Sequence, residues 1–100
     1  MATSKEYFSF ISESLSGLDG VSYRKMMGEY ILYSRGKVVG GIYDDRLMIK
    51  PTKSAVKLVE NSGKDLAFAV PYPNAKEMYL ADVDDIAFTV EMIIAVSNDV

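Results

Sequence analysis

The chain has 100 residues, of which 49% are hydrophobic and 25% are charged, and its formal net charge is −3. This balance fits a single domain over residues 1–100 that buries roughly two thirds of its unfolded surface. The absence of Cys and His excludes disulfides, Ser-His-Asp triads and zinc sites built from those ligands. Charged residues interrupt the apolar runs, so we expect no export signal, no membrane span and a cytoplasmic location.

A helix is predicted near the N-terminus. Thr3 followed by Glu6 indicates a capping box, and apolar residues then recur at helical spacing, so the helix should run from about Ser4 to Ser16. Gly17 follows and is expected to end it, because glycine adopts the left-handed conformations found at helix ends.

Four segments with strand character come next: 21–26, 30–34, 37–43 and 46–50. The connections at Gly28, Arg35-Gly36 and Asp44-Asp45 are short, which favours antiparallel hairpins. Gly40 and Gly41 lie inside the third segment. They predict a bulge or close packing under a helix.

A short second helix is predicted after Pro51, with Thr52 as its N-cap and Ser62-Gly63 at its end. Two short strands, 68–70 and 76–80, then surround a Pro71-Tyr72-Pro73-Asn74 turn. Three aspartates, at positions 82, 84 and 85, precede a third helix that ends near Ser97. They suit the positive end of that helix and lack the Gly and Glu of a calcium loop.

The predicted order is helix, four strands, helix, two strands, helix. This order indicates an α+β two-layer fold, with an antiparallel sheet covered on one face by the helices. The second strand has apolar residues on both alternations, so an apolar sheet face that includes Leu32 and Met48 should stay uncovered. Since exposed apolar surface costs about 25 cal/mol per Å², we expect a homodimer or a protein partner to cover that face.

No catalytic, cofactor-binding or metal-binding residue is predicted, and the chain is not expected to be an enzyme. Residues 24–57 carry eight cations and three anions, whereas residues 58–100 carry two and eight. This asymmetry fits solvated strand edges and helix ends, or a dipolar surface that orients a partner or pairs two copies. The candidate partner surface comprises Arg24, Lys25, Glu29, Arg46 and Lys50.

The sequence is also compatible with two alternatives to a protein-interaction role. One is direct nucleic-acid binding by the basic 24–57 region. Because the net charge of the whole chain is negative, we do not expect the chain to bind DNA on its own. The other is a small-molecule-binding or enzymatic domain, suggested only by the Tyr and Arg content of the sheet.

The segment Arg24–Tyr33, with Arg35–Lys37 and Asp44–Lys50 after it, resembles the signature of the TfoX (Sxy) N-terminal domain family of bacterial proteins associated with competence regulation. Pro71–Tyr79 is a second similar segment. The resemblance implies a type III secretion chaperone-like fold. It also implies a regulatory, protein-interaction role linked to transcription, with a DNA-bound transcription activator as partner. Full regulators of this kind carry a further C-terminal helical domain, so the chain is interpreted as an excised domain or a stand-alone relative.

Overall fold

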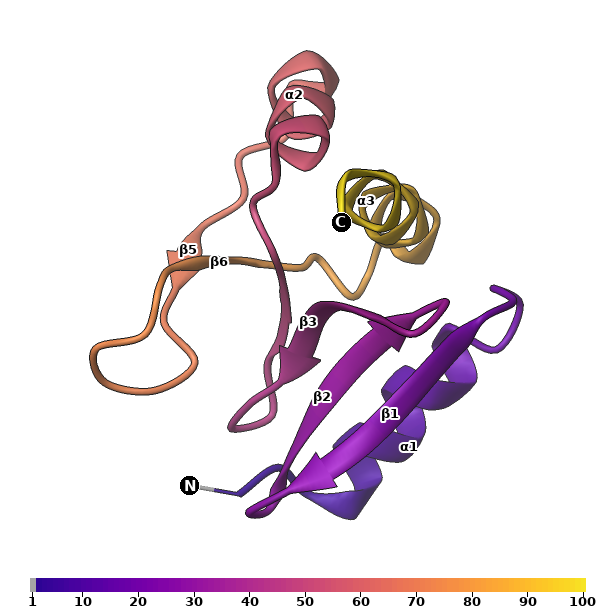
Figure 1. The fold of residues 1–100 in the computed structure, drawn as a ribbon, viewed down its shortest axis with the longest axis vertical. Coiled ribbons are helices and arrows are strands. Elements are labelled where there is room, and N and C mark those ends of the chain that lie inside the picture. Colours follow the sequence, from indigo (N-terminus) through magenta and orange to yellow (C-terminus); the bar gives the residue numbers. More distant parts are fainter. Residues whose placement is uncertain (1) are drawn as a thin grey trace.

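The computed structural model describes residues 2–100; Met1, the first residue of the predicted domain, lies outside the described residues. The described chain forms α1 (Lys5–Ser14), β1 (Val21–Met26), β2 (Glu29–Ser34), β3 (Lys37–Ile42), β4 (Leu47–Ile49), α2 (Lys53–Ser62), β5 (Phe68–Ala69), β6 (Met78–Leu80) and α3 (Ile86–Asp99) (Figure 1). The predicted α+β class and the predicted order of elements are confirmed.

The strands form one antiparallel sheet in the order β1-β2-β3-β4-β6-β5. Three consecutive hairpins have two-residue turns, at Met27-Gly28, Arg35-Gly36 and Asp44-Asp45, and all six turn residues have positive φ. Positive φ at both positions defines a type I′ turn, whose twist matches that of the flanking strands. The predicted hairpins are therefore confirmed.

The glycine pair in β3 lies at a bulge, as predicted. Leu32 is opposite Gly40 and Tyr33 is opposite Val38, so Val39 is the additional residue. A Cβ atom on Gly40 would overlap the backbone of β4, and one on Gly41 would overlap the ring of Tyr43. The close packing is therefore with a neighbouring strand and a tyrosine, and the alternative of packing under a helix is wrong.

All three helices contribute to one hydrophobic core. Their buried residues are Ile11, Leu15, Ala55, Val59, Phe88, Met92, Ile93 and Val96, and the strands contribute Tyr30, Leu32, Val39, Ile42, Leu47, Ile49 and Tyr79. Figure 1 shows α3 beside α2, and the two helices pack against each other. Phe8 of α1 stacks on Tyr30 at 3.9 Å between ring centroids. The helices therefore cover one face of the sheet.

The prediction that Leu32 and Met48 lie on an uncovered apolar face is wrong for both residues. Leu32 faces the helices and is fully buried. Met48 alternates with core residues Leu47 and Ile49 and so faces the opposite side, yet it is 0% exposed. The β5–β6 connection folds over that side, where Tyr72 lies edge-on to Tyr43 with ring centroids 6.5 Å apart.

The first helix begins one residue later than its predicted capping box implies. Ser4 is the N-cap, and its hydroxyl accepts a hydrogen bond from the N–H of Tyr7 at 3.1 Å. The hydroxyl of Thr3 instead donates to the carboxylate of Glu29 at 2.8 Å. Thr3 therefore joins the N-terminal segment to the sheet, and the predicted Thr3 cap is corrected to Ser4.

Candidate functional site

The five residues predicted as a partner surface lie toward two ends of the sheet. The β1–β2 and β3–β4 turns share one end, where the carboxylate of Glu29 accepts a hydrogen bond from the N–H of Asp44 at 3.1 Å. Arg24, Lys25 and Arg46 lie toward this end. Lys50 follows β4 at the other end, so the structure does not bring the five side chains onto one surface.

Two of the five residues have roles within the fold. Glu29 holds the N-terminal segment and the β3–β4 turn through its bonds to Thr3 and Asp44. Arg46 is half-buried, and its backbone pairs with Tyr43 to close the β3–β4 hairpin. Of the five residues, only Arg24 and Lys25 are exposed, and the other three are half-buried.

The exposed cations of β1 lead into an exposed apolar turn. Met26 is 45% exposed and Met27 is 96% exposed, and Met27 has φ +53°. We call Arg24, Lys25, Met26 and Met27 the hairpin-tip surface. Sequence reasoning missed the two methionines. The available signal was Met at the first position of a two-residue turn, where Asn, Asp or Gly is favoured.

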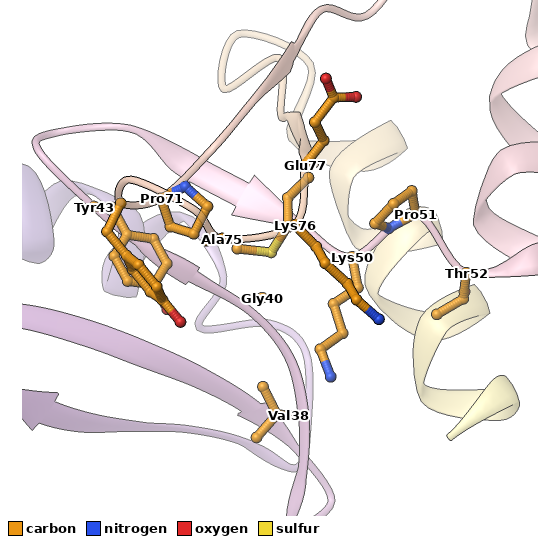
Figure 2. A pocket seen from close by; sticks show the side chains of 12 residues that line it. Val38, Gly40, Tyr43, Lys50, Pro51, Thr52, Pro71, Ala75, Lys76 and Glu77 are labelled. Carbon is orange, nitrogen blue, oxygen red and sulfur yellow. The ribbon is translucent and has the colours of Figure 1, made fainter.

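Lys50 lines a hollow on the helix-free face of the sheet, together with side chains from the β5–β6 connection (Figure 2). The hollow has a volume of about 550 Å³. We call it the lysine hollow; its lining residues are Val38, Gly40, Tyr43, Lys50, Pro51, Thr52, Pro71, Tyr72, Ala75, Lys76, Glu77 and Met78. Sequence reasoning found Lys50 but did not find its neighbours.

Two cations dominate the charge of the lysine hollow. Figure 2 shows the side chains of Lys50 and Lys76 both extending into the hollow, while the carboxylate of Glu77 points away. Among residues 2–100, the only ion pairs within 4.0 Å are those of Lys64 with Asp82 and Asp85, so neither lysine is paired.

A tyrosine forms the opposite wall of the lysine hollow. Burial raises the pKa of Tyr43, and the neighbouring Tyr72 and Glu29 act in the same direction. The hydroxyl of Tyr43 therefore stays protonated at neutral pH and can donate a hydrogen bond.

Within the acidic cluster before α3, Asp85 acts as the helix cap, in line with the prediction. The carboxylate of Asp85 accepts from the N–H of Phe88 at 3.1 Å and pairs with Lys64 at 2.8 Å. Within residues 2–100, no group of three His, Cys, Asp or Glu side chains is placed to hold a metal ion. No helix in that range is both long enough and apolar enough to cross a membrane.

These features define a small α+β domain with two separate surfaces suited to binding: an exposed hairpin tip and a cationic hollow. The chain belongs to the TfoX N-terminal domain family, which it matches over residues 13–92. It is also 37% identical over 82 residues to an "Uncharacterized 12.7 kDa protein in trpE 5'region" of Spirochaeta aurantia, covering 82% of this chain and 68% of that protein. No solved structure matches the chain.

Proposed function

We propose that this chain is a non-enzymatic regulatory domain of the cytoplasm that acts by binding another protein through its hairpin-tip surface. Membership of the TfoX N-terminal domain family supports a regulatory domain in general. The resemblance to TfoX extends the proposal to transcriptional control of competence genes, with a DNA-bound activator as the partner. The exposure of Met27 is the observation that carries the proposal.

Neither the side chain nor the backbone conformation of Met27 stabilises the folded state. The left-handed conformation costs an L-residue other than Gly, Asn or Asp about 1–2 kcal/mol, and Met27 has φ +53°. Its side chain is 96% exposed and therefore contributes little to the core. Asn before Gly28 would suit the type I′ turn better. An unfavourable residue in an exposed place motivates a functional explanation.

The chemistry of the tip suits a protein partner. Met26 and Met27 are flexible and polarizable, and such side chains adapt to apolar depressions on a partner. Arg24 and Lys25 precede them on opposite faces of β1, so each would lie at the rim on its own side of the contact, where charge sets orientation and association rate. The surface therefore favours a partner with an apolar depression bordered by acidic groups.

The proposal is tested by Met27→Asn. We expect this variant to unfold at the same or a higher temperature, because Asn fits the turn. In affinity capture from an extract of the native cell, it should retain about fivefold less of the partner than wild type, in keeping with a loss of about 1 kcal/mol or more at a central contact. Arg24→Glu with Lys25→Glu should also reduce retention.

Phe10→Gln is the matched control, because Phe10 is 46% exposed on α1 and lies outside the hairpin-tip surface. It should retain the same partner as wild type. The proposal is contradicted if Met27→Asn and wild type capture the same proteins in equal amounts. A duplex titration at low salt should show no binding, because the net charge of −3 supplies little phosphate neutralisation.

A further inference from the structure

We propose that the lysine hollow binds a small organic dianion, either a phosphate monoester or a dicarboxylate, with its charged groups at Lys50 and Lys76 and its apolar body against Tyr43. This site is separate from the hairpin-tip surface, and the inference does not depend on the proposed protein partner. It assigns the hollow a ligand class from the charge, shape and construction of its walls.

The positive charge of the lysine hollow favours binding of an anion. Lys50 and Lys76 come from segments 26 positions apart, and both line the same hollow (Figure 2). Neither lysine is paired with a carboxylate of the described residues. Two ammonium groups that line one hollow repel each other, and a ligand with two negative charges relieves that repulsion while accepting charge-assisted hydrogen bonds. A dianion therefore fits better than a monoanion.

The remaining walls of the lysine hollow are apolar and favour a ligand with an apolar, organic part. Val38, Pro71 and Met78 provide apolar surface, and Tyr43 adds an aromatic ring with a hydroxyl donor. Small-molecule sites typically measure about 300–1,000 Å³ and combine apolar walls with a few polar groups. The volume of about 550 Å³ lies in that range.

The tyrosine wall depends on a glycine. Gly41 lies beneath Tyr43, and a Cβ atom there would overlap the ring. The absence of a side chain at Gly41 therefore lets the Tyr43 ring lie against the sheet. The ring of Tyr72, 6.5 Å away, packs against Tyr43 from the β5–β6 connection.

The position of each lysine is set by hydrogen-bonded backbone. The N–H of Lys50 donates to the carbonyl of Val39 at 2.9 Å, which attaches this residue to β3. Lys76 follows a turn in which the N–H of Ala75 donates to the carbonyl of Tyr72 at 3.1 Å. Pro73 followed by Asn74 at φ +68° gives this turn the pattern of type II. The two cations are thus carried by structured segments, which lowers the cost of ordering them on binding.

The inference is tested by NMR titration of the methyl signal of Met78 near neutral pH, with phenyl phosphate, phthalate, inorganic phosphate and phenol as probes. We expect phenyl phosphate or phthalate to shift the signal saturably, with a dissociation constant of about 1 mM or tighter. Binding of phenyl phosphate alone assigns the phosphate monoesters, and binding of phthalate alone assigns the dicarboxylates. Phenol should produce no saturable shift.

Charge variants provide the second part of the test. Lys50→Gln with Lys76→Gln should weaken binding at least about tenfold, because two charge-assisted contacts are lost. Lys53→Gln with Lys57→Gln is the matched control: both lysines are exposed on α2 and lie outside the hollow. This control should bind as wild type does, and thermal unfolding verifies that each variant is folded.

Three results would overturn the inference. They are no saturable shift with either organic dianion up to about 10 mM, equal binding by the Lys50 and Lys76 variant, or equal binding of inorganic phosphate and phenyl phosphate. The last result would show that the apolar walls contribute nothing. Met27→Asn should bind the probes as wild type does, so failure of the protein-partner proposal and failure of this inference are separately visible.

Discussion

Gly41 is a residue whose missing side chain shapes both the sheet and the lysine hollow. An added Cβ atom would overlap the ring of Tyr43 and lie 2.8 Å from the carbonyl oxygen of Tyr30. The backbone oxygen cannot move away cheaply, because β2 and β3 are paired at this point. The site therefore has no room for even one methyl group.

We predict that Gly41→Ala lowers the free energy of unfolding by about 1–3 kcal/mol, the usual cost of forcing an extra group into a packed site. Urea unfolding measures this change. Gly17→Ala is the control, since a Cβ atom there meets nothing within 4 Å; its stability should be unchanged or slightly higher. Equal stability of Gly41→Ala and wild type would contradict the tight packing of the Tyr43 ring.

The start of α2 shows how one element can depend on another that is distant in the sequence. Thr52 is the N-cap, as predicted, but its side chain makes no capping hydrogen bond. The carboxylate of Asp99, at the end of α3, instead accepts from the N–H of Ser54 at 2.7 Å and from its hydroxyl at 2.6 Å. The last residues of α3 therefore cap α2.

This cap and the Asp85 cap of α3 make the helices sensitive to acid. The hydroxyl of Ser54, followed by the side chain of Thr52 and the N–H of Ser54, lowers the pKa of Asp99. Lys64 with the N–H of Phe88 lowers the pKa of Asp85. A lowered pKa in the folded state means that the unfolded state binds more protons at low pH. The stabilisation is therefore present above the ordinary aspartate pKa of 3.8 and is lost as the pH falls through the lower folded values.

We predict that thermal stability falls below about pH 4 and that Asp85→Asn with Asp99→Asn makes this fall smaller. Thermal unfolding measured across the acid range tests the prediction. Asp19→Asn, at an exposed position outside both caps, is the control and should leave the fall as in wild type. An acid transition of the same size in the double variant would contradict a role for these caps.

Sequence reasoning located the elements well because their signals are local. Turn residues such as Arg35-Gly36 and Asp44-Asp45 indicate where each strand ends, and the β3 glycines indicate the bulge. The errors came from contacts between distant positions. The hydroxyl of Thr3 donates to Glu29, 26 positions away, and so does not cap the helix. Met48 is buried on the face over which the later β5–β6 connection folds.

The same limit applies to the candidate site. Lys50 could be selected from the charge pattern, but Lys76 lies 26 positions further along and lines the same hollow only because β6 pairs with β4. The ring of Tyr43 becomes a wall of the hollow only because Gly41 is beneath it. Neither relation is visible in a local pattern, so the lysine hollow could not be predicted before the topology was known.

At the scale of the whole molecule, the basic and acidic stretches of the sequence correspond to different helices and strands. The basic stretch 24–57 includes β2, β3 and β4, whereas the acidic stretch 58–100 includes β5, β6 and α3. The two stretches meet where β4 pairs with β6 and where α2 packs against α3. The charged residues themselves lie mainly in the turns, connections and helices, since β4, β5 and β6 carry none. That this asymmetry orients an approaching copy or partner stays a prediction.

The helix-free sheet face gives the last prediction, which concerns self-association. Ile31 and Tyr33 lie on this face, on the alternation opposite to buried Leu32, and both are only half-buried. The β5–β6 connection folds over the part of this face near Tyr43, but no helix of residues 2–100 covers the face, so a second copy would remove further apolar surface from water.

We predict that the wild-type chain forms dimers at about tens of micromolar in light scattering, and that Tyr33→Glu shifts it toward the monomer because a charge would then be placed in the contact. Ser9→Glu, on the exposed side of α1, is the control and should dimerise as wild type does. A wild-type chain that stays strictly monomeric under these conditions would contradict self-association. The half-buried tyrosine and isoleucine would then have to be accounted for by a different partner on the same face.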